Sequence, residues 1–276
     1  MRLGDAARAW AQDAARAATP DAPVLVLTGA GISAASGIPT FRGPEGYWRV
    51  GSRNYRPEEL ATRAAFEAMP DEVWSWYLYR RGVCRRAAPN EAHHALAALE
   101  ERLGTRFRLV TQNVDGLHAR AGHDPARLYA IHGSIDLMRP VGGGAVVPIP
   151  EAVPIDWPKT RALGPAERAL LVHEGERTRP HVLWFDESYD EAHFRFESTL
   201  RAAAAACLVM VVGTSGATTL PLHVGRLAAQ RGTPLLVVNP EPNPFVAMLE
   251  AGAPGAFVQG TATEAVPALC TLLGGG

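Results

Sequence analysis

A dense set of polar side chains follows one strand-like run of the sequence. Residues 107–110 form a short, mainly apolar run, and the octet TQNVDGLH at residues 111–118 comes directly after them. Loops at the carboxyl end of a parallel strand face the ligand crevice of an α/β fold, so Gln112, Asn113 and Asp115 are candidates to bind a polar ligand. Asn113 and Asp115 could equally cap the helix that follows, and the residues alone leave both interpretations open.

A histidine beside a glycine follows a second short strand-like run. His132 and Gly133 come after residues 129–131, in a chain with nine histidines. Histidine is the side chain whose ordinary pKa lies nearest neutral pH, so it suits a general base. An isolated histidine at such a place more often packs in a core or caps a helix. The glycine would allow backbone to approach closely beside the ring.

A glycine turn follows an apolar run near the N-terminus. Residues 24–27, VLVL, are branched and apolar as a buried parallel strand is, and they lead into TGAGISAASGIPTFRG at residues 28–43. Missing side chains at Gly29 and Gly31 let backbone amides approach a pyrophosphate, and Ser33 is expected to open a helix whose N-terminus favours an anion. Short glycine patterns also occur in ordinary tight turns, so the spacing alone does not decide.

Together these segments resemble one known family. The loop at residues 28–43 is similar at nearly every position to the cofactor-binding loop of the sirtuins, which are NAD-consuming protein deacylases. The octet at residues 111–118 resembles the sirtuin motif TQNxDxLH, and the His-Gly pair at residues 132–133 stands where sirtuins keep their catalytic base. HVLWFDE at residues 181–187 resembles HVVWFGE, and GTS at residues 213–215 resembles a turn that contacts the cofactor.

The resemblance implies a set of catalytic and cofactor-binding residues. His132 is implied as the general base, and Asn113, also catalytic, would contact the nicotinamide ribose together with Gln112. Asp115 would hold the nicotinamide carboxamide, and Phe41 would cover the reactive sugar face. The residues implied to bind NAD are Gly29, Ala30, Gly31, Ile32, Ser33, Phe41, Arg42, Gln112, Asn113, Asp115, Gly213, Thr214, Ser215, Asn239 and Ala262.

The implied reaction cleaves the bond between nicotinamide and ribose. An acyl-lysine carbonyl oxygen attacks C1' of the ribose, nicotinamide leaves, and an alkylimidate forms. His132 then deprotonates a ribose hydroxyl, which attacks the imidate carbon, and water releases the deacylated lysine and O-acyl-ADP-ribose. A glycine turn by itself would also suit a redox enzyme. The pair Phe41-Arg42, with Asn113, Asp115 and His132, favours nicotinamide cleavage instead.

The segment at residues 181–187 is implied to bind an acyl-lysine protein or peptide. In the family its backbone pairs with the substrate as an added strand, a mode that tolerates varied sequences. Asp186 stands where the family usually has glycine, and residues 216–221 replace a more usual apolar segment of the other peptide-flanking loop. The residues implied to contact the substrate are Val182, Trp184, Phe185 and Glu187.

A helical segment with aromatic and arginine residues bears on the acyl group. WSWYLYRR at residues 74–81 places Tyr77 and Arg80 on one helix face, which by itself is more often packing with a solvated charge. With residues 46–49 and 89–93 on either side, the segment resembles the class III sirtuins. Their Tyr-x-x-Arg pair binds the carboxylate of succinyl- or malonyl-lysine, and a guanidinium suits a bidentate contact with that group.

Cysteine usage sets this chain apart from most of the family. Sirtuins ordinarily bind a structural zinc through two cysteine pairs, whereas Cys84, Cys207 and Cys270 form no CxxC pair. Because a tetrahedral zinc site needs four cysteine or imidazole ligands, we predict a zinc-free protein with no metal ligand set. Three scattered cysteines also argue against a disulfide framework and favour a reducing, cytoplasmic compartment.

Alternating strand-like and helical runs predict a Rossmann-like α/β fold, with helices on both faces of a parallel sheet and a smaller inserted lobe. Strand-like runs occupy residues 24–27, 107–111, 129–131, 182–185, 208–213, 235–239 and 256–259, and helical patterns occupy 90–103, 165–173, 191–206, 222–231 and 264–273. We expect one catalytic domain over residues 1–276. Its large lobe would comprise about 1–43, 104–133 and 181–276, and its small lobe about 44–103 and 134–180.

Composition bounds the partners. With 276 residues, 47% hydrophobic and 20% charged, and a formal net charge of -1, the chain gives no electrostatic reason to expect nucleic acid. No apolar run is long enough to span a bilayer, so no membrane partner is expected. Residues 1–18 contain Asp5 and Asp13 and lack an apolar core, so they predict a surface helix rather than a signal peptide. A monomer is the default.

Three functions remain open from sequence. The first is an NAD-dependent protein-lysine deacylase that prefers acidic acyl groups, with plain deacetylation as a variant. The second is a sirtuin-fold ADP-ribosyltransferase or NAD hydrolase, to which the missing zinc ligands and Asp186 lend weight. The third is a non-catalytic sensor of NAD or ADP-ribose, against which Asn113, Asp115 and His132 count.

Overall fold

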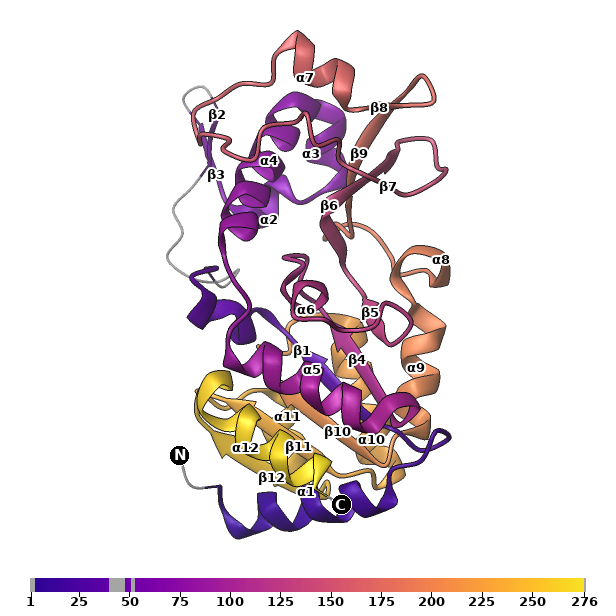
Figure 1. The fold of residues 1–276 in the computed structure, drawn as a ribbon. Coiled ribbons are helices and arrows are strands. Elements are labelled where there is room, and N and C mark those ends of the chain that lie inside the picture. The colour runs from indigo at the N-terminus through magenta and orange to yellow at the C-terminus, as the bar shows by residue number, and fades with distance from the viewer. Residues whose placement is uncertain (1–2, 40–47, 51–52, 276) are drawn as a thin grey trace.

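The computed structural model of the protein describes residues 3–39, 48–50 and 53–275, with the side chains of 48–50, 53 and 54 left aside. A six-stranded parallel sheet forms its larger part (Figure 1). Its strands are β1 (Val24–Thr28), β4 (Phe107–Thr111), β5 (Leu128–Ala130), β10 (Leu208–Val212), β11 (Leu235–Asn239) and β12 (Gly255–Gln259), in the order β12-β11-β10-β1-β4-β5. The predicted Rossmann-like fold is confirmed.

Helices cover both faces of this sheet because its strands are apolar on both sides. Along β1, Val24 and Val26 join the core beneath α1 (Asp5–Ala17), α5 (Glu91–Leu103) and α12 (Ala262–Gly274). Leu25 and Leu27 join the opposite core, beneath α9 (Phe196–Ala205), α10 (Thr219–Arg231) and α11 (Pro244–Glu250). Because side chains alternate along a strand, successive residues of β1 pack into two separate cores.

A smaller lobe lies beyond the upper edge of the sheet in Figure 1. It contains an antiparallel sheet in the order β7-β6-β9-β8, built from β6 (Gly133–Pro140), β7 (Val147–Pro148), β8 (Val172–His173) and β9 (Glu176–Val182). Helices α2 (Pro57–Leu60), α3 (Arg63–Ala68), α4 (Pro70–Arg86) and α7 (Pro165–Leu170) and the hairpin of β2 (Trp48–Val50) and β3 (Arg53–Tyr55) complete it. A third apolar core, rich in tryptophan, fills this lobe.

The remaining elements are short: η1 (Ala30–Ser36), η2 (Gly104–Arg106), α6 (Leu117–Arg120) and α8 (Glu191–Phe194). Three details differ from the sequence prediction. The run 182–185 does not join the parallel sheet, because β9 ends at Val182 and pairs with β6. The helix expected over 191–206 is divided at Arg195, which has φ 54°. The helix expected over 165–173 ends at Leu170, before β8.

Polar contacts tie the small lobe together. The Arg81 guanidinium, buried in α4, donates to Asp136 on β6 at 3.0 Å, and Arg85 reaches the same carboxylate at 2.7 Å. The indole of Trp74 donates to the Thr178 carbonyl at 3.0 Å. Among the residues that the structure describes, no group of three His, Cys, Asp or Glu side chains is arranged to hold a metal ion.

Loss of the buried ion pair of Arg81 with Asp136 should cost more stability than loss of an exposed ion pair of the same helix. Removing one partner of a buried pair costs about 3–5 kcal/mol, and since the Asp136 side chain is 25% exposed we expect Asp136→Ala to cost about 2–3 kcal/mol of unfolding free energy. Asp156→Ala is the matched control, because it removes an exposed partner of Arg86 on the same helix and should cost roughly 0–1 kcal/mol. Urea unfolding measures both, and equal losses would contradict the assignment.

Candidate active site

The candidate site lies at the carboxyl ends of β1, β4 and β10. Strand β1 pairs with β10 on one side and with β4 on the other, so the chain reverses its strand order between β1 and β10. A crevice at such a switch point is where open α/β sheets bind ligands. The glycine turn, the TQN octet and the GTS turn all start there, as the sequence predicts for a shared site.

The glycines of the first turn pack against the turn after β10. The Gly31 amide donates to the Gly213 carbonyl at 2.8 Å, and the Gly29 amide donates to the Val212 carbonyl at 3.0 Å. A Cβ at Gly31 would lie 2.7 Å from the Gly213 Cα, closer than real side chains come. These two amides are therefore already paired. The helix after them, η1, begins at Ala30 and is a 3-10 helix, so Ser33 lies inside it rather than opening it.

Asn113, Ser33 and Asp115 form one hydrogen-bonded group. The Asn113 amide nitrogen donates to the Gly29 carbonyl and to the Ser33 hydroxyl, both at 3.1 Å. Ser33 donates to Asp115 at 2.7 Å, and the other Asp115 oxygen accepts the Leu117 amide at 2.8 Å. Asp115 thus accepts the first amide of α6, as the capping interpretation predicts, and also faces Ser33, while its ligand-binding role stays a prediction. Burial raises the Asp115 pKa, opposed by the hydrogen bonds from Leu117 and Ser33.

Gln112 joins β4 to the turn after β10. Its amide nitrogen donates to the Thr214 hydroxyl at 2.9 Å, and its amide oxygen accepts the Thr218 hydroxyl at 3.0 Å. Thr218 was not a sequence candidate, since it lies in the stretch 216–221 that departs from the family pattern. The contact fixes the Gln112 side chain at the crevice edge.

His132 is held as a neutral imidazole in one tautomer. Its Nδ1 lies 2.9 Å from the Gln112 carbonyl, which can only accept, so Nδ1 carries the proton and Nε2 has the lone pair. Burial lowers the His132 pKa to about 4, partly offset by that carbonyl. Tyr189, another residue that the sequence did not single out, has its hydroxyl 2.8 Å from Nε2.

The backbone conformation and close packing at position 133 explain why a glycine follows this histidine. It adopts φ 83°, and a Cβ there would lie 2.1 Å from the His181 carbonyl oxygen. Only glycine avoids both the unfavourable dihedral and that collision. The close approach lets β6 start against the end of β9 directly after His132, which places the general-base candidate next to the substrate segment.

Two buried histidines complete the floor of the site. His93 Nε2 lies 3.5 Å from the Ser33 hydroxyl, and His118 Nε2 lies 3.0 Å from the Thr28 hydroxyl. Burial lowers the pKa of His93 to about 4 and that of His118 well below its usual value. Both rings are therefore neutral near pH 7. They belong to the segments 89–93 and 111–118, although the sequence assigned them no role.

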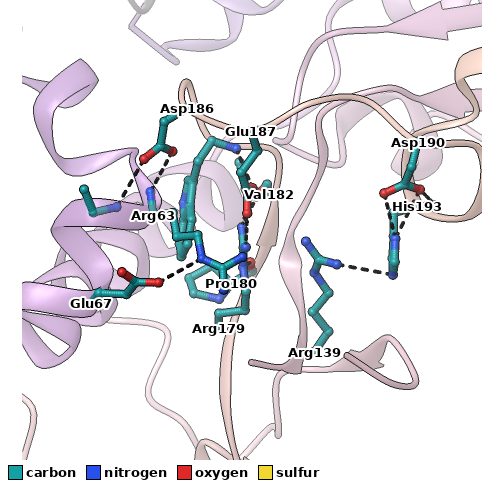
Figure 2. Close-up of polar contacts among 12 residues, drawn as sticks. Arg63, Glu67, Arg139, Arg179, Pro180, Val182, Asp186, Glu187, Asp190 and His193 are labelled. Atoms are coloured by element: carbon teal, nitrogen blue, oxygen red, sulfur yellow. Dashed lines mark hydrogen bonds and ion pairs between the residues drawn. The ribbon is translucent and has the colours of Figure 1, made fainter. Parts of the chain in front are cut away.

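The candidate substrate segment is anchored by two carboxylates (Figure 2). The Glu187 side chain binds the buried Arg179 guanidinium through both its oxygens and accepts the Trp184 amide at 3.1 Å. Burial raises the Glu187 pKa, but the hydrogen bonds and charge of Arg179 outweigh it and hold that pKa below its usual value. Asp186 accepts the amides of Arg63 at 2.7 Å and Ala64 at 3.1 Å. Asp186 therefore caps α3.

The backbone of this segment is already largely paired. The Leu183 amide donates to the His132 carbonyl at 3.0 Å, and the Phe185 amide donates to the Ala61 carbonyl at 2.9 Å. With Trp184 bound to Glu187, the three successive amides are all occupied, so an added strand would have to use other groups here. Val182 and Trp184 are buried, whereas the Phe185 side chain is 56% exposed.

Tyr77 and Arg80 occupy different surroundings on α4. Arg80 lines a small cleft with Ile38, Pro39, Tyr79, Val83 and Cys84. Tyr77 is buried and its hydroxyl accepts the Trp184 indole proton at 3.0 Å. Burial raises the Tyr77 pKa, so its phenol stays protonated. The charge of Arg80 lowers the pKa of both Tyr77 and Asp115, which links the cleft to the Asp115 group electrostatically.

The other candidates lie along the same edge or outside the described residues. Ser215 is exposed in the turn after β10, Asn239 ends β11 and donates to the Glu241 carbonyl at 2.6 Å, and Ala262 begins α12. Phe41 and Arg42 lie outside the described residues, as do positions 46 and 47 of the segment 46–49. Their predicted roles stay predictions.

The fold and the site define a doubly wound α/β protein with a ligand crevice at the switch point and an inserted antiparallel lobe. The profile of the Sir2 family matches residues 29–219. A NAD-dependent protein deacylase of Thermus thermophilus is 41% identical over 242 residues, 87% of this chain and 87% of the relative. The chain therefore belongs to the Sir2 family.

Solved structures agree with that assignment. A Sir2 homologue in complex with NAD superposes with a TM-score of 0.74 at 32% identity, covering 95% of this chain and 92% of the other. A mutant Sir2 homologue in complex with 2'-O-acetyl ADP ribose gives a TM-score of 0.73 at 34% identity, with 91% of each chain covered. No helix in the described part of the chain is long and apolar enough to cross a membrane.

Proposed function

We propose that this protein is an NAD-dependent protein-lysine deacylase that releases nicotinamide and O-acyl-ADP-ribose. One observation carries the proposal: the Ser33, Asn113 and Asp115 group and the neutral His132 meet at the switch point of a Sir2-family chain. The deacylase names of the relatives and the NAD and acetyl ADP ribose complexes of similar structures support it. The cofactor-contact residues named from the sequence are part of the same proposal.

The residues present suit NAD. Each Asp115 oxygen accepts one hydrogen bond from within the chain and keeps a second lone pair for the amide protons of a carboxamide. Asn113 and Gln112 present amide groups at the crevice edge, where ribose hydroxyls would be bound. When bound, NAD supplies an electrophilic ribose carbon and a nicotinamide leaving group.

His132 is the group that moves a proton. Its Nε2 lone pair faces away from the Gln112 carbonyl, and its low pKa keeps that lone pair free of a proton at neutral pH. Nε2 accepts the proton of a ribose hydroxyl, which frees the hydroxyl oxygen to attack the acyl carbon. Asn113 and Asp115 act before this step by orienting the ribose and the nicotinamide.

A combined assay tests the proposal. The protein is incubated with NAD and acetyl-, succinyl- or unmodified peptides, and acyl loss, nicotinamide release and peptide mass are followed. We expect nicotinamide release coupled to acyl loss, with acyl loss abolished by His132→Ala because His132 acts after nicotinamide has left. Release without an acyl peptide would support NAD hydrolysis instead, and a gain in peptide mass would support ADP-ribosylation. The occupied amides of residues 183–185 are the observation that favours keeping this second candidate.

We propose further that Arg80 and Tyr77 select acidic acyl groups. Arg80 lines the cleft, and its guanidinium can bind a carboxylate. Trp184 is the donor in its bond to Tyr77, because an indole nitrogen cannot accept, so the phenol proton is not used there. A small movement of the acyl group or of α4 would be needed for the buried Tyr77 phenol to reach the acyl carboxylate.

Arg80→Met tests this specificity. A charge-assisted hydrogen bond is worth about 1.5–3 kcal/mol, so the ratio of kcat/KM for succinyl- over acetyl-peptide should fall about 10- to 100-fold. Arg86→Met, on the same helix and paired with Asp156, is the control and should leave the ratio unchanged. An unchanged ratio in Arg80→Met would sink the assignment.

We propose that the small lobe holds no zinc and that the chain is a cytoplasmic monomer. Cys84 and Cys270 are buried thiols, and Cys207 is a partly buried one, all three unpaired. Ion pairs of Arg81 and Arg85 with Asp136 supply cohesion that a metal would otherwise give. Metal analysis of the purified protein is the measurement, and one equivalent of zinc would refute the zinc-free lobe.

A further inference from the structure

Tyr189 occupies the one atom of His132 that the proposed reaction needs. Because Nδ1 donates to the Gln112 carbonyl, Nε2 has a single lone pair, and the Tyr189 hydroxyl lies 2.8 Å from it. An unprotonated imidazole nitrogen accepts, so the phenol is the donor. Burial raises the Tyr189 pKa to about 12, opposed by a contact with the Thr218 hydroxyl, so the phenol keeps its proton at neutral pH.

The Tyr189 position is fixed by its neighbours rather than by chance. Its ring stacks on Phe196 with a centroid distance of 6.2 Å. Two residues before it, Glu187 is bound to Arg179, and directly after it Asp190 caps α8 by accepting the His193 amide at 2.6 Å (Figure 2). Displacing the phenol therefore requires rotation of its side chain, because the backbone is anchored on both sides.

We propose that Tyr189 is a cap on the general base that keeps His132 from serving water until an acyl-lysine substrate is bound and a ribose hydroxyl displaces the phenol. The inference rests on the proposed function. A single lone pair accepts one strong hydrogen bond, so the phenol and the ribose hydroxyl compete for Nε2, and a loosely placed water competes less well than either. Tyr189 acts through His132, so it is a positioning residue for that ring.

The electrostatic surroundings of His132 make the effect readable. Burial and the Gln112 carbonyl account for the pKa shift of His132, and no charged side chain in the described part of the chain contributes to it. The other titratable group that faces the ring is Tyr189. A hydrogen bond donated to the lone pair favours the neutral ring, so removing the phenol hydroxyl should raise the His132 pKa. The acid limb of the activity profile should then move to higher pH.

Tyr189→Phe is the test, measured as nicotinamide release without peptide and as deacylation across pH. We expect peptide-independent release to rise about 3- to 10-fold, since one neutral hydrogen bond is removed, while deacylation at pH 8 is not reduced. The acid limb of deacylation should shift upward. Tyr129→Phe is the control, since it removes the hydroxyl of a half-buried phenol on β5, and it should change neither quantity.

A double variant separates the cap from other causes. If His132 activates the water that cleaves NAD, the extra nicotinamide release of Tyr189→Phe should be lost when His132→Ala is added. Unchanged release and an unmoved profile in Tyr189→Phe would overturn the cap, and so would a large fall in deacylation, which would show that the phenol carries the proton itself. If wild-type protein shows no deacylation at all, the proposed function fails instead.

Discussion

The contact between the turn after β1 and the turn after β10 is the constraint on which the site depends. Gly31 and Gly213 meet backbone to backbone, and a side chain at either position would push the two strand ends apart. Asn113 then joins β4 to the first turn through the Gly29 carbonyl, and Gln112 joins it to the second through Thr214. Three neighbouring strand ends are thereby locked, and the polar side chains that follow them inherit fixed positions.

Burial sets the charge states of the histidines at the site. His93, His118 and His132 are kept neutral by desolvation, so these histidines add no positive charge around Asp115 to that of Arg80 and Arg120. A positively charged pyridinium ring beside such a carboxylate would meet attraction without competing cations on the histidines. Loss of neutral nicotinamide removes that attraction.

The sheet was predictable because buried parallel strands have a distinct apolar pattern, and the meeting of the glycine turn, the TQN octet and the GTS turn because each follows such a strand. Other features depend on contacts that no local pattern encodes. Residues 182–185 have the composition of a strand, but β9 ends at Val182 and the amides that follow donate to loop carbonyls instead. Arg195 breaks a helix-like pattern with a positive φ. Tyr189 and Thr218 are single polar residues in loops, and only the fold brings them to His132 and Gln112.

Residues 186–189 form one of the connections between the two lobes. Asp186 binds the first amides of α3 in the small lobe, whereas Tyr189, three positions later, binds His132 at the edge of the large sheet. Glu187 lies between them and holds the segment to Arg179 on β9. Any shift of α3 relative to the parallel sheet must therefore strain this segment, because Asp186 binds α3 and Tyr189 binds His132. Asp186 and Tyr189 thus link the lobe arrangement and the access to His132 through one segment.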